Sequence, residues 1–136
     1  MIYTKDIIKN HTIGDYTYGG PEIIDRWGGK LTIGKYCSIA KNVTILLGGN
    51  HNTDWVTTYP FVRVNDEKDI HPRNEEPVII GNDVWIGMDV LILPGVTIGD
   101  GAIIGARTVV SRDIGSYCIC VGNPGRVVKK DLMTIL

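Results

Sequence analysis

One histidine in this chain stands where a general base could act. His51 follows Ile45 by six residues, at a position where a regular aliphatic pattern would place another aliphatic side chain. A histidine that replaces a core residue where a loop begins can have one ring nitrogen held by the protein and the other exposed, as general base catalysis requires. The spacing alone also fits a structural histidine at the edge of the fold.

Basic residues gather near the C-terminal end of the chain. Residues 107–130 contain five basic residues and one acidic residue, a balance of +4, whereas residues 1–106 have a balance of −4. The five basic residues are Arg107, Arg112, Arg126, Lys129 and Lys130. Clustered cations of this kind bind phosphate groups, so this segment is a candidate anion site, although a solvated basic end would have the same composition.

The elements that must position these residues follow from a repeat of six residues. A branched aliphatic residue returns at every sixth position, at Ile80, Ile86, Ile92, Ile98, Ile104 and Val110. A second small or branched residue follows each of them by four positions, at Val84, Val90, Val96, Ala102, Thr108 and Ile114. A spacing of six fits no α-helix, but an even spacing keeps the recurring side chains on one face of a strand. The repeat therefore predicts a solenoid of short strands.

The same step occurs earlier in the chain, at Ile33, Ile39 and Ile45. Residues 13–18, which read IGDYTY, look like one further unit. Ile45 and Ile80 are 35 residues apart, one short of six periods. A loop over about residues 52–77 is therefore predicted to interrupt the coil.

The overall composition narrows the class of protein. The 136 residues are predicted to form one domain, residues 1–136. The 14 basic and 15 acidic residues give a net charge of −1, which offers no general electrostatic basis for binding nucleic acid or an anionic membrane. No apolar run approaches the roughly 20 residues of a membrane span, and the first residues lack the apolar stretch of a signal peptide, so we expect a cytoplasmic protein.

The three cysteines lack the spacing of a disulfide framework or of a four-ligand zinc site. They are Cys37, Cys118 and Cys120. We expect them to be reduced packing residues, and we expect no metal cofactor.

The repeat matches a known consensus of an aliphatic residue, a small residue, two variable positions, a small residue and one variable position. Over residues 13–130 the chain resembles the hexapeptide-repeat acyltransferases. The resemblance implies an all-β fold, a left-handed parallel β-helix of hexapeptide repeats in which three units make one triangular coil, here with one excursion loop. It also implies a homotrimer, which would cover the flat apolar walls that so few coils leave exposed.

The residues around His51 carry a second resemblance. The segment GGNHNTDWVTTYPF resembles the surroundings of the catalytic histidine in xenobiotic acetyltransferases, which modify chloramphenicol and streptogramins, and in related sugar O-acetyltransferases. This resemblance implies that His51 is the catalytic base. Aromatic rings with an acid suit a sugar face or an antibiotic ring, and equally suit packing of the loop on the coil. The predicted acceptor site contains Tyr18, Tyr36, Asn50, Asp54 and Trp55.

Two motifs near the C-terminal end resemble the end of the β-helix in maltose and galactoside O-acetyltransferases. They read IGARTVVSRD and GNPGRVVK. The resemblance implies acetyl-CoA as the co-substrate. By this resemblance Ala106 would offer its backbone N–H to the pantetheine, Ser111 and Arg112 would lie near the adenosine, and Arg126 and Lys129 would face phosphate groups.

The motif GNDVWIG at residues 81–87 is shared with many relatives, and it adds Trp85 and Gly87 to the predicted cofactor site. Trp85 occupies an outward position, which suits packing at a subunit interface as well as contact with the pantetheine arm. Met88 stands where the sugar enzymes often have serine, which puts one cofactor contact in question.

Together these features predict an acetyl-CoA-dependent O-acetyltransferase that modifies a sugar hydroxyl, of a surface polysaccharide or a nucleotide sugar, by direct transfer with a histidine base. The short excursion favours an exposed acceptor, and the chain has no GxSxG elbow for an acyl-serine intermediate. The alternatives are an antibiotic-modifying acetyltransferase, an N-acetyltransferase acting on an amino sugar, and a non-catalytic scaffold. A zinc-dependent carbonic anhydrase would require three histidines at set spacing, whereas His11 is expected at the surface and His71 in the polar loop.

Overall fold

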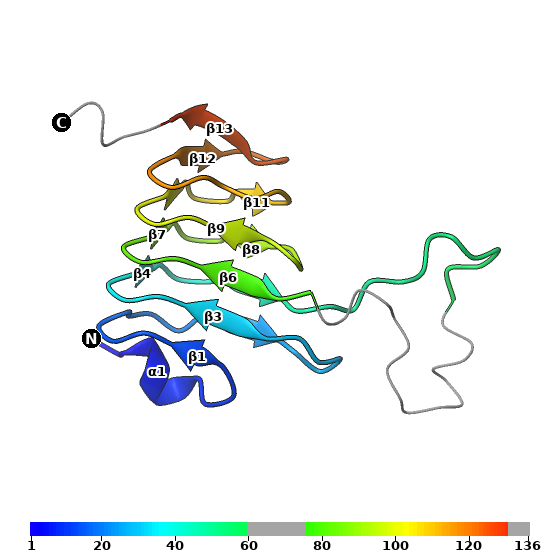
Figure 1. Cartoon of the computed structure of the whole chain (residues 1–136), viewed down its shortest axis with the longest axis horizontal. Helices are drawn as coiled ribbons and strands as arrows, with labels where there is room; N and C mark the ends of the chain where they lie inside the picture. The colour runs from blue at the N-terminus through cyan, green and yellow to red at the C-terminus, as the bar shows by residue number, and fades with distance from the viewer. Residues whose placement is uncertain (60–75, 131–136) are drawn as a thin grey trace.

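The chain winds into a stack of triangular coils whose short strands form three parallel walls (Figure 1). The computed structural model describes residues 1–59 and 76–130. Sheet I contains β1 (Thr12–Ile13), β3 (Leu31–Ile33), β6 (Val78–Ile80) and β9 (Thr97–Ile98). Sheet II contains β4 (Ser38–Ile39), β7 (Trp85–Ile86), β10 (Ile103–Ile104), β12 (Ile119–Val121) and β13 (Arg126–Lys129). Sheet III contains β2 (Glu22–Ile24), β5 (Thr44–Leu46), β8 (Leu91–Ile92) and β11 (Val109–Val110).

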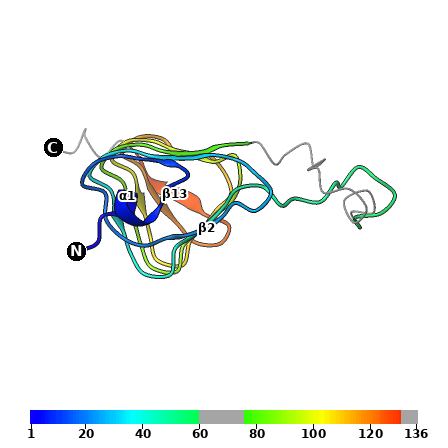
Figure 2. The same cartoon turned by 90° about the horizontal axis from the view of Figure 1, so that it is seen from below.

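The chain passes from sheet I to sheet II to sheet III and then returns to sheet I one level higher. Seen along the stack, the coils superimpose into a triangular outline (Figure 2). Every strand pairs in parallel with its neighbours except β13, which turns back antiparallel on β12. The solenoid of short strands predicted from the period of six is therefore confirmed, and its strands run parallel, as the family resemblance implied.

One short helix departs from the all-β expectation. It is α1 (Thr4–Ile7), at the N-terminal end of the stack. Thr4 is fully buried, and both of its hydrogen-bond donors are used. Its hydroxyl donates to the Gly19 carbonyl at 2.7 Å, and its backbone N–H donates to the Thr17 carbonyl. These bonds hold α1 against the first coil, where no further coil covers the apolar interior.

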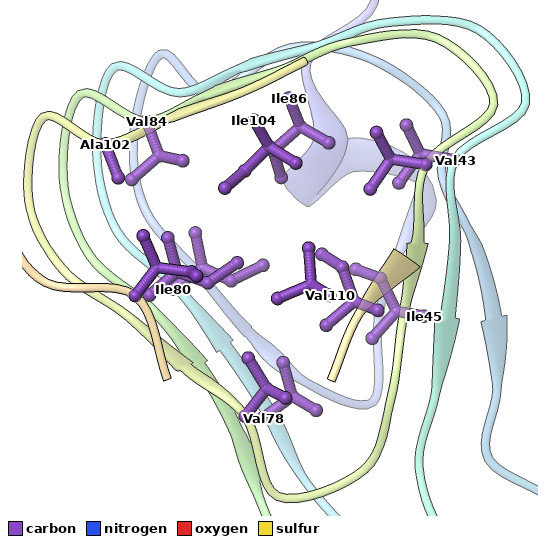
Figure 3. Close-up of a cluster of buried hydrophobic side chains, with 14 of the residues drawn as sticks. Val43, Ile45, Val78, Ile80, Val84, Ile86, Ala102, Ile104 and Val110 are labelled. Carbon is purple, nitrogen blue, oxygen red and sulfur yellow. The ribbon is translucent and has the colours of Figure 1, made fainter. Parts of the chain in front are cut away.

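The register shows that one coil takes three repeats. Ile80 pairs with Ile98, 18 positions later, and the pairings on the other two walls have the same step. Side chains of both predicted columns point into the coil, where they stack on their equivalents above and below (Figure 3). The predicted inward positions from Ile80 to Val110 are all buried, at most 2% exposed, including Thr108, whose hydroxyl donates to the Gly105 carbonyl.

The corners of the coil require a backbone conformation that few residues adopt. In most units the residue three positions after the inward aliphatic has a positive φ, the exceptions being those that begin at Ile23 and Val110. These residues are Tyr16, Tyr36, Asn42, Gly48, Asp83, Asp89, Gly95, Gly101, Arg107 and Tyr117. Only three of them are glycine, although this region is unfavourable for other residues. The parallel ladders on both sides of each corner therefore hold the chain in the turn.

The glycines that follow the aliphatic column have a different role. A Cβ atom on Gly87 would lie 2.7 Å from the backbone nitrogen of Ala106 in the next coil. Gly34 and Gly81 are equally close to the coil above them. Glycine at this position therefore allows successive coils to approach closely, rather than allowing the turn itself.

Two of the departures from the 18-residue step bear on positions predicted from the sequence. Ile33 pairs with Ile80, 47 positions later, so this coil carries 29 additional residues after β5. The described part of this segment leaves the coil where the chain passes from sheet III to sheet I, hereafter the III–I corner (Figure 1). Residues 60–75 of the predicted loop, with His71, lie outside the described residues.

The second departure corrects one position of the repeat. Ile114 was expected in the second inward column, four residues after Val110. It pairs instead with Ile98 and so begins the next coil on sheet I. The III–I corner is two residues shorter here than at the preceding coil, which moves Ile114 into the first column.

The three cysteines are free and buried. Burial raises the pKa values of the Cys37 and Cys120 thiols, which keeps both protonated and unreactive. The prediction that they are packing residues is confirmed. In the described part of the chain, no helix has the length and apolar character needed to cross a membrane.

Two adjacent residues of β6 test the core. Ile80 is 1% exposed, whereas Ile79 points outward and is 42% exposed. We expect Ile80→Ala to lower the free energy of unfolding by about 2–5 kcal/mol, since it leaves a cavity between stacked coils. Ile79→Ala is the matched control and is expected to cost less than about 1 kcal/mol. Equal losses of unfolding free energy for the two variants, measured by denaturant unfolding, would contradict the assignment of Ile80 to the inward column.

Candidate active site

His51 lies just outside the III–I corner, after the coil has ended at the buried residue Leu47. Its ring nitrogen Nδ1 lies 2.6 Å from the carbonyl oxygen of Thr58. A carbonyl only accepts hydrogen bonds, so Nδ1 carries the hydrogen and Nε2 carries the lone pair of the neutral ring. The loop itself therefore orients the ring.

The loop residues predicted for the acceptor site accompany His51. Asn50, Asp54 and Trp55 are all exposed on the same segment, and Trp55 is 43% exposed. The Asp54 backbone N–H donates to Asn52 Oδ1 at 2.8 Å, which forms a tight turn after the histidine. These side chains can meet a ligand together with His51.

The two predicted tyrosines lie elsewhere in the same chain. Tyr36 occupies the corner between sheets I and II, where its ring stacks on Tyr16 at 5.1 Å between centroids. Tyr18 bridges to Ser38 on sheet II. His51 is at the III–I corner, so one chain does not bring these tyrosines to it. The reason is that each repeat turns one corner of the triangular coil. Tyr36 belongs to the corner two repeats before the III–I corner, where His51 lies.

A hollow near the C-terminal end gathers part of the predicted cofactor site. It has a volume of about 510 Å³ and is lined by Ser111, Arg112, Asp113, Ile114 and residues 124–127. It brings Ser111 and Arg112, which follow β11, next to Arg126, which begins β13. Lys129 lies further along β13 opposite Ile119 and is not among the residues lining the hollow.

The remaining predicted cofactor residues lie on or near sheet II. Gly87 and Ala106 lie on successive coils in close contact, at the corner between sheets II and III. Ala106 is an exposed residue, and its backbone N–H has no acceptor among the described residues. Trp85 points outward from β7, between Ser38 and Ile103, and is 57% exposed. Both interpretations of Trp85, cofactor contact and subunit interface, require such an outward ring.

Comparison with known proteins identifies the family to which this chain belongs. Residues 77–112 match the family described as bacterial transferase hexapeptide (six repeats). A chloramphenicol acetyltransferase of Agrobacterium fabrum (strain C58) is 36% identical over 115 residues, which cover 78% of this chain and 54% of that protein. A maltose O-acetyltransferase from Clostridium difficile 630 has a TM-score of 0.61 and 33% identity, over 90% of this chain and 67% of that one. The chain belongs to the hexapeptide-repeat acyltransferase family.

A further hexapeptide-repeat acetyltransferase, from Vibrio cholerae O1 biovar eltor and complexed with acetyl coenzyme A, has a TM-score of 0.71 and 30% identity. The similarity covers 90% of this chain and 62% of that one. The parallel strands and this family fit a left-handed β-helix. The chain spans about half the length of several relatives that it matches in sequence.

His11 corrects an expectation for this hexapeptide-repeat protein. It was expected at the surface, but its side chain is 5% exposed. Its Nδ1 accepts from the Leu31 backbone N–H at 3.1 Å, and its Nε2 donates to Asp25 Oδ2 at 2.8 Å. The description of residues 1–59 and 76–130 contains no group of three or more His, Cys, Asp or Glu side chains that could hold a metal ion.

Trp27 lies beside the His51 segment, and the sequence analysis did not identify it. A Cβ atom on Gly49 would lie 2.8 Å from the Trp27 ring, so the ring packs directly on the backbone two residues before His51. One signal was available in the sequence: Ile23 and Ile33 are ten residues apart, four more than one repeat. In the structure, Ile23 accordingly pairs with Ile45 after 22 residues instead of 18. The additional residues form the turn that carries Trp27.

Proposed function

We propose that this protein is an acetyl-CoA-dependent O-acetyltransferase that acts on a sugar hydroxyl with His51 as general base. The observation that carries the proposal is the bond from His51 Nδ1 to the Thr58 carbonyl, which leaves the lone pair on Nε2. Family membership and the similarity to a maltose O-acetyltransferase support the reaction class and a saccharide acceptor. We propose a surface polysaccharide or a nucleotide sugar as that acceptor.

The proposed chemistry is direct transfer. Acetyl-CoA supplies the acetyl group as a thioester and leaves as the free thiol. His51 Nε2 takes the proton of the acceptor hydroxyl as its oxygen attacks the thioester carbonyl, and it returns that proton to the leaving sulfur. The Thr58 carbonyl stabilises the cationic ring between the two steps. Backbone N–H groups, with Asn50 beside the histidine, are our candidates for stabilising the oxyanion.

The residues present fit a ligand with phosphate groups and an amide-bearing arm. Arg112 and Arg126 share one hollow and can bind phosphate groups, and Ser111 lines the same hollow as a hydroxyl donor. The exposed Ala106 N–H can donate to an amide of the pantetheine, and the bare backbone of Gly87 permits its close approach. We assign Lys129 to the outer phosphate and Trp85 to the pantetheine arm or to a subunit interface.

The acceptor is proposed to bind between the His51 segment and a neighbouring chain. Asn50, Asp54 and Trp55 are exposed around the histidine and offer hydrogen-bonding groups and an aromatic face. Tyr18 lies on sheet II and Tyr36 at the corner between sheets I and II of their own chain, so they would reach an acceptor from a second subunit of a homotrimer. Both tyrosines retain partly exposed rings that such a contact can use.

Antibiotic modification is a second candidate with the same chemistry. The similarity to a chloramphenicol acetyltransferase, 36% over 115 residues, supports it. Transfer to an amino sugar would use the same base. A panel of chloramphenicol, streptogramin, neutral sugars and amino sugars, with thiol release from acetyl-CoA as the readout, separates these acceptors.

The role of His51 predicts a specific kinetic defect. His51→Ala is expected to lower kcat by roughly a hundredfold or more, the usual contribution of a general base, with unchanged affinity for acetyl-CoA. Thr53→Ala, an exposed change in the same segment, is the matched control. Turnover of the His51 variant within a few-fold of wild type, where chemistry limits the rate, would remove His51 from the mechanism.

The hollow predicts where phosphate groups bind. Arg126→Ala and Lys129→Ala are each expected to weaken acetyl-CoA binding by about 1–3 kcal/mol, the range for losing a hydrogen bond to a charged group. Lys41→Ala removes an exposed cation at the corner between sheets II and III and is the control. Calorimetric titration that gives unchanged affinity for both variants would place the phosphate site elsewhere.

The walls of the coil predict a homotrimer. Outward residues of sheets II and III include Trp85, Leu91 and Ile103, whereas sheet I presents threonines, Thr12, Thr32 and Thr97, with one aliphatic residue, Ile79. Apolar walls of this kind are covered by subunit association. Sedimentation is expected to show three times the chain mass of 15.0 kDa at micromolar concentration.

Paired variants sharpen the test of the trimer. Leu91→Asp is expected to dissociate the subunits, and Thr32→Asp, an outward residue of sheet I, is expected to leave them associated. A stable wild-type monomer, or equal sensitivity to both changes, would contradict the proposal.

A further inference from the structure

The turn that follows β2 lies at the same corner as the His51 segment. Both leave the coil where the chain passes from sheet III to sheet I, and Figure 2 shows the end of β2 on the side from which the chain after β5 departs. The turn covers residues 25–30 and contains the four residues by which this coil exceeds the regular step. An enlarged turn directly below the histidine is placed to contact whatever the histidine acts on.

His11 holds both ends of this turn. Its Nε2 donates to Asp25 at the beginning, and its Nδ1 accepts from the backbone of Leu31 at the end. Both ring nitrogens are therefore used in structural bonds, and the ring is almost fully buried. The turn is consequently fixed at its two ends rather than free to move as an ordinary surface loop.

Trp27, in the middle of the turn, packs on the backbone that leads to His51. Gly49 has a φ of +84°, and the Trp27 ring occupies the space that a side chain there would require. Two residues of chain span at most about 7 Å, so the ring lies close to the backbone of His51. Trp27 is only partly buried, which leaves part of the ring surface accessible.

Arg26 adds a cation to this aromatic surface. Its guanidinium carbon lies 5.2 Å from the centroid of the Trp27 ring, within the range of a cation–π contact. Its neighbour Asp25 is already bonded to His11, and Arg26 forms no ion pair within the described ranges. Lys30, at the end of the turn, lines a hollow of about 250 Å³ with Lys9, so the cations Arg26, Lys30 and Lys9 lie around a turn whose one carboxylate is that of Asp25.

We propose that Arg26 and Trp27 form an acceptor subsite that selects sugars carrying an anionic group. The ring supports the apolar face of the sugar, and the guanidinium binds a carboxylate or a phosphate in two parallel hydrogen bonds. A stacked guanidinium loses little side-chain freedom on binding, because the ring already holds it. This inference rests on the proposed function, since it assigns the acceptor of the same site.

The test compares sugars that differ only in charge. Methyl glucuronide, methyl glucoside and a phosphate ester of methyl glucoside are titrated into wild type and Arg26→Gln, with binding followed by ligand-observed NMR and transfer followed by thiol release. We expect wild type to bind one of the charged sugars about tenfold or more tightly than the neutral one. Which charged sugar is preferred distinguishes a carboxylate from a phosphate as the recognised group.

Arg26→Gln is expected to abolish this preference by raising the KM for the charged sugar while kcat changes little. Arg26→Lys restores it in part, because it keeps the charge but not the paired hydrogen bonds. Lys41→Gln, an exposed cation at another corner, serves as the control and keeps the preference. Trp27→Leu is expected to weaken the binding of charged and neutral sugars alike.

Equal affinity of wild type for charged and neutral sugars, or an unchanged preference in Arg26→Gln, overturns the subsite. Its failure is distinguishable from failure of the proposed function. Transfer to sugars without any preference for charge supports the acetyltransferase and rejects the subsite. Charge-selective binding through Arg26 without transfer to any sugar supports the subsite and rejects the proposed acceptor chemistry.

Discussion

The stacking of inward side chains between successive coils governs this structure. Each repeat places two side chains in the interior, and each must meet its equivalent 18 residues away at the same height on a parallel ladder. An added residue within a strand would turn every later side chain to the wrong face, because side chains alternate along a strand. Additional residues are tolerated at the corners, where the chain is already outside the ladders. The fold thus confines additional residues to the corners of its coils.

This confinement explains why several of the proposed site residues lie at one corner. The III–I corner carries the turn with Trp27, the segment with His51 and, two coils higher, Ser111 and Arg112. The rigid coils beneath hold these segments at fixed heights, so each loop needs only local bonds to orient its side chains. The Thr58 carbonyl does this for His51, and His11 does it for the turn below.

The two described histidines show how partners decide what an imidazole can do. His51 donates from Nδ1 to a carbonyl, so the basic nitrogen of the neutral ring is Nε2. His11 accepts at Nδ1 from a backbone N–H and donates from Nε2 to a carboxylate, so neither nitrogen remains for chemistry. The residue type is the same, and only the surrounding donors and acceptors separate a candidate base from a structural clamp.

The amino-acid sequence by itself determined the period of six, the two inward columns and the departure of the chain after Ile45, because each depends on alternation along a strand. It also determined which segments resemble known cofactor and acceptor sites. Only the tertiary structure decided which of those residues meet. It joined Arg112 to Arg126 in one hollow, separated Tyr36 from the corner of His51, and shifted Ile114 into the next coil. Whether two residues on different coils become neighbours depends on the number of residues at every corner between them. A local sequence pattern does not specify those numbers.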